Sequence, residues 1–164
     1  MDLVLRPMTA DEWEPWNVQQ AAGYVEQLVE MGGLTLTDAE AKAARDDESL
    51  LPDGMATAGH RFLVAEHDGQ PVAWLWLGVA DDPTTPATVW VYDVEVHAGS
   101  RGQGIGRRVM ELAEEVVRDM GGTSIMLNVF AGNEVARSLY DSLGYEVVES
   151  RPSGHNMHKD LASP

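Results

Sequence analysis

The sequence contains no cysteine, which excludes disulfide bonds, cysteine-ligated zinc and a thiol nucleophile. Basic residues are also scarce: 11 lysines and arginines stand against 27 aspartates and glutamates, for a net charge of −16. So acidic a chain is unsuited to binding nucleic acid or an anionic membrane surface, because their phosphates repel it. The charge favours cationic ligands, or it serves only to keep the protein soluble.

Long apolar runs are absent as well. No stretch approaches the roughly 20 apolar residues that cross a bilayer, and the longest run, residues 72–80, is predicted to be a buried strand. The N-terminus has two acids and a proline where a signal peptide keeps its apolar region. We therefore expect a soluble, cytoplasmic protein with no membrane partner.

No internal repeat, low-complexity segment or long linker divides the 164 residues, of which 44% are hydrophobic. A chain of this length and composition is expected to form one domain over residues 1–164.

Turn residues and hydrophobic periodicity predict elements in the order β-α-α-β-β-β-α-β-α-β-β. Capping patterns, a hydroxyl followed three positions later by a carboxylate, begin the first two helices at Thr9 and Thr37. Asp68-Gly69 predicts a tight hairpin. The strands are predicted near residues 3–5, 61–66, 71–79, 88–97, 124–130, 145–150 and 157–161, and a loop over residues 81–86.

This order predicts an α+β sandwich, in which helices cover both faces of one mixed, mostly antiparallel sheet of about seven strands. The helix after residue 104 is expected to turn one face to the core, formed by Ile105, Val109, Leu112, Val116 and Met120. The last helix is expected to do the same with Ala136, Leu139, Tyr140 and Leu143.

A glycine-rich segment, residues 98–106, joins a predicted strand to a predicted helix. It lacks the Gly-Lys-Ser/Thr ending of a nucleotide-binding Walker loop, and Val109 stands where a dinucleotide fingerprint needs glycine. Two interpretations remain. Either the helix N-terminus, with the positive charge of Arg101, Arg107 and Arg108, binds a pyrophosphate, or the glycines only shape a turn.

A second pattern lies downstream, where Asn133, Ala136 and Tyr140 form N-x-x-A-x-x-x-Y before Leu143-Gly144-Tyr145. Together with the R-x-x-G-x-G of residues 101–106, it resembles the GNAT superfamily of N-acetyltransferases. The resemblance is specific from about residue 89 to residue 161, and the N-terminal half agrees only in element order. It implies a GNAT fold, in which the central strands splay apart.

The resemblance also implies a co-substrate, acetyl-coenzyme A, and no metal. The pantetheine arm would bond to strand backbone at Val94, Glu95 and Val96, and Asn133 would contact it from the other side. The pyrophosphate would be held by Arg101 and by the backbone N–H groups of Gly102, Gln103, Gly104, Ile105, Gly106 and Arg107. Asn128, Ala136 and Tyr140 complete the predicted cofactor site.

Tyr140 occupies the position of the family's usual general acid. A thiolate leaves when an amine attacks a thioester, and a hydroxyl with a pKa of about 10 can protonate it. The alternative is that Tyr140 is simply an aromatic residue on the inner face of a helix.

Asp93 and Glu95 share one face of a strand that is otherwise valine and aromatic. They are candidates for the general base or for binding a cationic amine. The alternatives are that this face is partly wet or that an arginine pairs with the two acids. Asn128, a polar residue in an apolar strand, is expected to orient substrate or water, or to satisfy backbone groups.

These residues predict an N-acetyltransferase in which a primary amine attacks acetyl-coenzyme A directly in a ternary complex. The missing cysteine excludes an acetyl-cysteine relay. The alternative is a non-catalytic acyl-coenzyme A-binding module on the same fold. The acceptor, a small-molecule or peptide amine, is left open, as is a homodimer.

Overall fold

The computed structural model describes residues 1–79 and 87–161, so the predicted loop over residues 81–86 lies outside the described residues. The chain forms two compact units. One comprises Met8–Ala58, and the other comprises Met1–Pro7 together with Gly59–Pro164. The prediction of one domain stays a prediction.

The smaller unit is helical and contains α1 (Ala10–Glu30), α2 (Leu36–Leu50) and a short 3-10 helix (Gly54–Ala56). The predicted capping box at Thr9 is confirmed. The Thr9 hydroxyl accepts from the Glu12 N–H at 3.2 Å, and the Glu12 carboxylate accepts from the Thr9 N–H at 3.3 Å.

The predicted start of α2 at Thr37 is wrong by two residues. Thr35 caps this helix, because its hydroxyl accepts from the N–H of Asp38 at 3.2 Å. Thr35 also has a carboxylate three positions later, so the same pattern occurs twice in the segment and the earlier copy is used.

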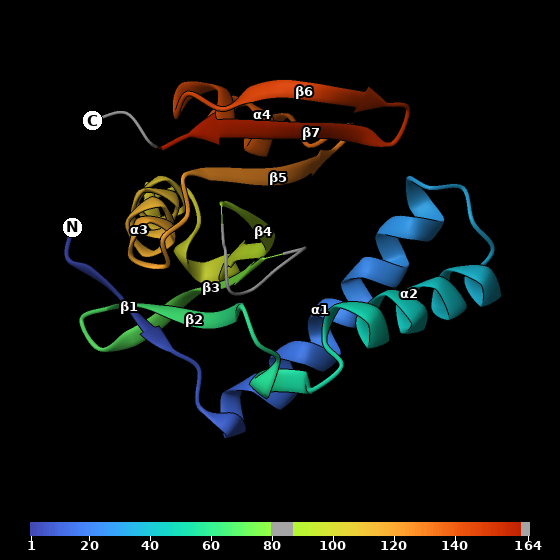
Figure 1. The fold of residues 1–164 in the computed structure, drawn as a ribbon, viewed down its shortest axis with the longest axis horizontal. Coiled ribbons are helices and arrows are strands. Elements are labelled where there is room, and N and C mark those ends of the chain that lie inside the picture. The colour runs from blue at the N-terminus through green and yellow to red at the C-terminus, as the bar shows by residue number, and fades with distance from the viewer. Residues whose placement is uncertain (80–86, 162–164) are drawn as a thin grey trace. The chain divides into compact units, whose positions relative to one another are not determined.

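Helices α1 and α2 lie side by side (Figure 1). Small and apolar residues fill the space between them, with Leu28, Ala39 and Ala43 buried. Tyr24 links the pair by donating from its hydroxyl to Asp46 at 2.8 Å. Across the two described ranges, no helix combines the length and the apolar character that crossing a membrane requires.

The larger unit is a seven-stranded mixed sheet, as predicted. Its strands are β1 (Leu3–Pro7), β2 (His60–His67), β3 (Gln70–Gly78), β4 (Thr88–Val96), β5 (Ser124–Phe130), β6 (Glu146–Arg151) and β7 (Gly154–Asp160). They lie in the order β1-β2-β3-β4-β5-β7-β6. Only β4 and β5 pair in parallel among these strands, and α3 (Ile105–Asp119) connects them.

The predicted hairpin between β2 and β3 is confirmed. Asp68 and Gly69 both have positive φ angles, 51° and 74°, and His67 pairs with Gln70 on either side of them. A two-residue turn of this kind matches the right-handed twist of the strands.

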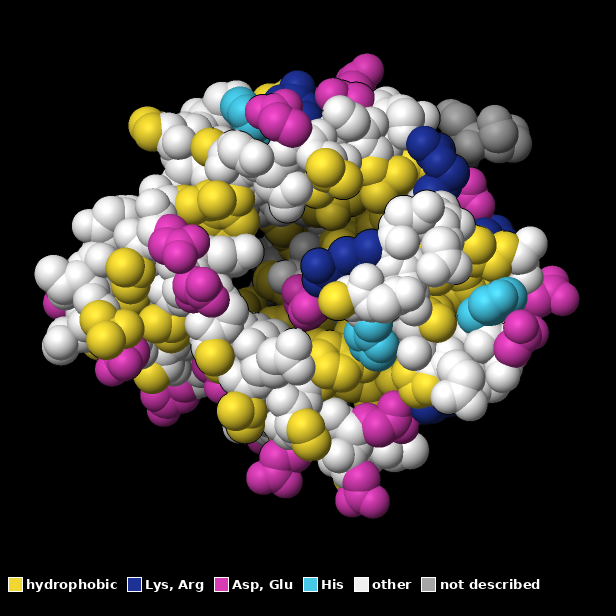
Figure 2. Space-filling view, turned by 180° about the vertical axis from the view of Figure 1, so that it is seen from behind, with side chains coloured by type: hydrophobic (Ala, Val, Ile, Leu, Met, Phe, Trp, Pro, Cys, Tyr) yellow, Lys and Arg dark blue, Asp and Glu magenta, His cyan; other side chains and the backbone are white. Residues whose placement is uncertain are grey.

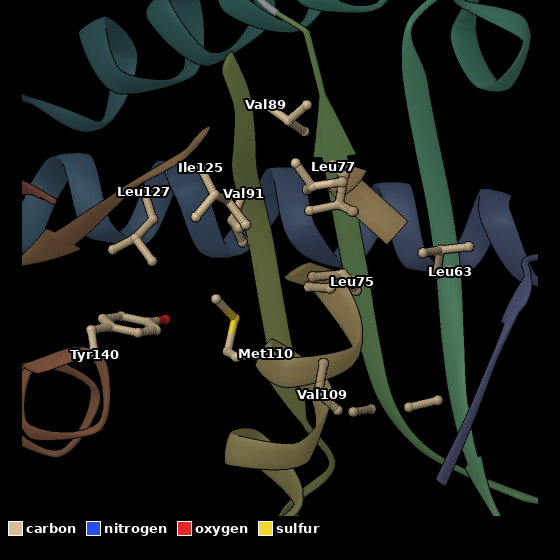
Figure 3. Close-up of a cluster of buried hydrophobic side chains, with 14 of the residues drawn as sticks. Leu63, Leu75, Leu77, Val89, Val91, Val109, Met110, Ile125, Leu127 and Tyr140 are labelled. Atoms are coloured by element: carbon tan, nitrogen blue, oxygen red, sulfur yellow. The ribbon is translucent and has the colours of Figure 1, made fainter. Parts of the chain in front are cut away.

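The core of this unit lies between one face of the sheet and the helices α3 and α4 (Glu134–Ser142). Figure 3 shows strand residues such as Leu75, Val91 and Leu127 gathered around Met110 and Tyr140. The inward face predicted for α4 is confirmed. Because α3 and α4 pack into the same cluster, the prediction of helices on both faces stays a prediction for the other face.

The predicted face of α3 is partly wrong. Ile105 and Val109 are buried, but the other three predicted residues only pack at the margin of the core. The buried centre of the helix is instead Met110, Ala113 and Val117. The buried face of the helix is thus rotated from the predicted one towards Met110, Ala113 and Val117.

Glu114 is a buried carboxylate on α3 that the periodicity did not reveal. It is 7% exposed, and the ammonium group of Lys159 on β7 donates to both its oxygens, at 2.8 and 2.9 Å. The Tyr145 hydroxyl also donates to it at 3.5 Å. The pair ties α3 to β7. It also neutralises the Glu114 carboxylate, whose burial as a lone charge would be costly.

Lys159→Met is therefore expected to lower the free energy of unfolding by about 2 kcal/mol, because it removes the closer of two cations and leaves Glu114 with only Arg118, 3.9 Å away. Urea denaturation measures this. The double change Glu114→Gln with Lys159→Met should recover most of the loss. Lys42→Met, which breaks an exposed i,i+4 pair with Asp46, should cost about 0.5 kcal/mol. If the loss of stability in the double variant equals the sum of the losses in Glu114→Gln and Lys159→Met, the two residues are not coupled.

Candidate functional site

Strands β4 and β5 pair over only part of their length. Thr88–Val91 lies beside Ser124–Leu127, and the ladder ends there, although both strands continue. A bulge at Tyr92 interrupts the β3–β4 ladder at the same level, since Trp76 pairs with Asp93 and Leu77 with Val91. A bulge bends its strand and increases the local twist. The C-terminal half of β4 thus leaves an open edge towards β5, which is the divergence that the resemblance implies.

The backbone of this open edge can be assigned residue by residue. The His97 N–H donates to Val72 on β3 at 2.8 Å. Because backbone groups alternate in direction along a strand, Val94 and Val96 direct theirs away from β3, into the gap. Glu95 directs its own N–H and C=O towards β3. Of the three predicted arm-binding residues, Val94 and Val96 therefore direct their backbone groups to the open edge.

The glycine-rich loop runs from the end of β4, through a 3-10 turn (Ala98–Ser100), to the first turn of α3. Gly102 and Gly104 have φ angles of 75° and 79°, in the left-handed region. A Cβ atom on either would meet nothing within 4 Å, so this side of the loop is open. The first N–H groups of α3 have no partner within the helix, and its first turn contains no acidic residue.

Gly106 serves a different purpose from the two preceding glycines. A Cβ there would lie 3.4 Å from Leu139 Cδ2 on α4 and 3.7 Å from Val96 Cγ2 on β4, which is ordinary contact. Its φ angle is not positive. Gly106 thus sets the packing of the loop between α4 and β4, whereas Gly102 and Gly104 set its backbone path.

The three predicted cations all have partners within the protein, and that of Arg108 is Glu111 on its own helix. Arg101 turns back onto β4, where its Nε donates to the Val96 carbonyl at 3.0 Å. Its Nη2 lies 3.8 Å from a Glu95 carboxylate oxygen. Arg107 donates to the Ser142 hydroxyl on α4 at 2.5 Å. For Glu95, the alternative of a pairing arginine therefore describes this structure, and the sequence did not reveal the direction of Arg101.

Tyr140 extends from α4 into the core, and Figure 3 shows its hydroxyl directed towards Met110 and the strands. It is 7% exposed, and its ring lies edge-on to Tyr145 at 5.9 Å. Burial, with a contribution from the Asp93 charge, raises the pKa of Tyr140 to about 12. No hydrogen bond to its hydroxyl occurs within the described part of the chain. The residue is thus both a core aromatic and a neutral, available donor.

Asn133 is the N-cap of α4. Its side-chain oxygen accepts from the backbone N–H of Ala136 at 3.2 Å, which explains the asparagine at this position. Asn128 lies across the sheet on β5, and its amide donates to Asn156 on β7 at 2.9 Å. Asn156 in turn donates to Glu149. Both asparagines therefore have structural partners, and the Asn133 amide nitrogen remains able to donate.

The bulge changes which β4 residues face the core. Val91 lies in the core before it, and Val94 and Val96 pack against the same core after it. Asp93 and Glu95 consequently lie together on the opposite face, as predicted. Figure 2 shows acidic side chains spread over much of the surface it presents, while Lys and Arg side chains gather in few places.

His97 and Trp74 adjoin Glu95 on this face, and the sequence did not identify them as a pair. Trp74 is the register partner of Glu95, and its ring lies edge-on to His97 at 4.9 Å. The Nε2 atom of His97 is buried and has no hydrogen-bond partner among the described residues. In the two described ranges, no group of His, Asp or Glu residues is arranged to hold a metal ion.

Comparison with known proteins agrees with this geometry. Residues 23–145 match the acetyltransferase (GNAT) family. The chain is 29% identical over 153 residues to a Bacillus subtilis protein named uncharacterized N-acetyltransferase YdgE, which covers 92% of this chain and 96% of that protein.

Solved structures have the same architecture. The crystal structure of YycN from Bacillus subtilis superposes with a TM-score of 0.79 at 27% identity, covering 92% of this chain and 98% of that one. The PaiA N-acetyltransferase of Thermoplasma acidophilum, in complex with coenzyme A, shares the fold with a TM-score of 0.67 at 17% identity, covering 98% and 99%. The family match spans more than half of the chain, so the protein belongs to the GNAT family of acetyltransferases.

Proposed function

We propose that the chain transfers an acetyl group from acetyl-coenzyme A to a primary amine, by direct attack in a ternary complex. The observation that carries this proposal is the open edge of β4, which leads from the glycine-rich loop to the region of the Tyr140 hydroxyl. An extended donor molecule lying along that edge has its anionic end at the loop and its reactive end near a proton donor.

The loop fits a pyrophosphate on physical grounds. The free N–H groups at the start of α3 and the positive end of the helix dipole both favour an anion. Gly102 and Gly104 leave the approach open. Acetyl-coenzyme A supplies an activated acyl thioester, and Val94 and Val96 would hold its amide-containing arm as an added strand is held.

Tyr140 would protonate the departing thiolate as the amine nitrogen forms its bond to the acyl carbon and the C–S bond breaks. A pKa of about 12 keeps the hydroxyl protonated at neutral pH. The same burial would raise the pKa of the coenzyme A thiol, so the departing thiolate would also be a stronger base.

Asp93 and Glu95 would attract the amine and accept its proton. They lie on the side of β4 opposite the core, so an amine reaching the gap from that side meets a carboxylate before it meets the thioester. Glu95 is accessible to an incoming amine, with 39% of its side chain exposed. A carboxylate there attracts an ammonium ion and can accept its proton, directly or through water.

Gly104→Ala is expected to weaken binding of coenzyme A by about tenfold, because a side chain at this positive φ angle costs about 1–2 kcal/mol and distorts the loop. Gly106→Ala is the matched control and should change the dissociation constant by less than about twofold, since its Cβ makes only ordinary contacts. Isothermal titration calorimetry with coenzyme A measures both. Equal effects of the two changes would argue against the role of the left-handed loop.

Tyr140→Phe is expected to lower kcat about 100-fold, the usual contribution of a general acid, with little change in coenzyme A binding. Thiol release from acetyl-coenzyme A over a panel of primary amines measures kcat and also finds the acceptor. Unchanged turnover in the variant would remove Tyr140 from this role. A wild type that binds coenzyme A tightly but acetylates no amine in the panel would favour a non-catalytic acyl-coenzyme A-binding module.

The pH dependence follows from the raised pKa of Tyr140. The protonated form is required, so activity that depends on it is present below pH 12 and is lost only as the pH rises through about 12. The kcat of the wild type should therefore not fall between pH 8 and about 10. A loss of kcat with a midpoint near the ordinary tyrosine pKa of about 10 would contradict this assignment.

A further inference from the structure

We propose that Arg101 couples the two substrate sites: its guanidinium holds Glu95 and Val96 in the free protein, and donor binding releases both. Arg101 is then a positioning residue for the acceptor carboxylate. This inference rests on the proposed function, because it needs a donor along β4 and an amine at Glu95.

The first observation is where the Arg101 side chain lies. It follows β4 by five residues, yet it bonds back to that strand through Nε, 3.0 Å from the Val96 carbonyl oxygen. Its Nη2 reaches the Glu95 carboxylate at 3.8 Å. One guanidinium group thus touches the backbone of the open edge and a side chain on the acceptor face.

The Val96 carbonyl is part of the donor path. It points away from β3, into the gap beyond the last β4–β5 pair. An arm with amide groups that adds to this edge needs its carbonyl acceptors, and Arg101 already occupies one of them. Donor binding and the Arg101–Val96 hydrogen bond therefore compete for the same oxygen.

The second contact of Arg101 is with the Glu95 carboxylate. Its contact with a guanidinium shows that the carboxylate accepts a cation, which is the charge of an ammonium substrate. While Arg101 stays there, an incoming amine must displace it. Once a donor takes the Val96 carbonyl, the guanidinium loses its anchor and can turn to the donor's phosphates at the adjacent loop.

The consequence is that a bound donor frees the Glu95 carboxylate for the amine. Linkage requires the effect to be reciprocal: whatever weakens the hold of Glu95 on Arg101 must strengthen donor binding. The coupling is measurable with coenzyme A alone, without knowing the acceptor.

The test is a double-mutant cycle on the dissociation constant of coenzyme A, measured by calorimetry. Glu95→Gln should tighten binding about two- to fivefold, the size expected of an exposed ion pair. In an Arg101→Gln background, the same change should have no effect, because no guanidinium remains to be released. An effect of Glu95→Gln that persists in that background would be general electrostatics and would overturn the proposal.

Glu111→Gln is the matched control. Glu111 pairs with Arg108 at 3.2 Å on the adjacent helix, so the change removes the same charge near the loop without touching Arg101. It should leave the dissociation constant unchanged, and an equal tightening would also overturn the proposal.

A direct readout is the side-chain Nε–H signal of Arg101 in a nitrogen-15 NMR spectrum, assigned by its loss in Arg101→Gln. It should exchange slowly in the free protein and shift when coenzyme A is added. Exchange at the solvent rate in the free protein would overturn the proposal while leaving the proposed function intact. A wild type that binds no coenzyme A would instead overturn the proposed function, and this proposal with it.

Discussion

Four residue pairs are all that β4 and β5 share, and the arrangement of the site follows from where that ladder stops. A parallel ladder that continued would consume the backbone groups of Val94 and Val96 and close the sheet. Because the pairing ends, one strand edge in the middle of the sheet stays unsatisfied. An unsatisfied edge inside a folded unit has to be met by water, by a side chain or by a ligand, and here Arg101 meets one of its carbonyls.

The bulge at Tyr92 adds a second consequence to the same divergence. One extra residue shifts the alternation of side chains, so that valines face the core on both sides of it. Without the bulge, Val94 and Val96 would point away from the core, and the carboxylates of Asp93 and Glu95 would enter the apolar cluster. Burying two carboxylates there would cost several kcal/mol each. The bulge therefore lets one strand supply apolar packing, free backbone and acids.

Much of this could be read from the sequence where the signal is local. The Thr9 capping box, the Asp68-Gly69 turn and the order of elements depend on neighbouring residues, and they appear as predicted. The pattern around Asn133 and Tyr140 was recognised as a family signature, and the structure adds the reason for the asparagine, which caps its helix.

Features that depend on residues far apart in the chain could not be read in this way. The Glu114–Lys159 pair joins positions 45 residues apart, and periodicity treats a glutamate in a helix as solvent-facing. Periodicity predicts the wrong buried face for α3, because the burial of each residue depends on the strands against which the helix packs. The direction of Arg101 depends on an acceptor, the Val96 carbonyl, that is free only because β5 has diverged.

The charge of the protein places a further constraint on the site. A chain of net charge −16 repels a polyanionic donor at long range, so attraction has to be local. Backbone N–H groups at a helix start provide it without adding net charge. The positions of the few arginines therefore matter more than their number. Arg101 lies between the glycine-rich loop and β4, and its guanidinium group contacts both the Val96 carbonyl and the Glu95 carboxylate.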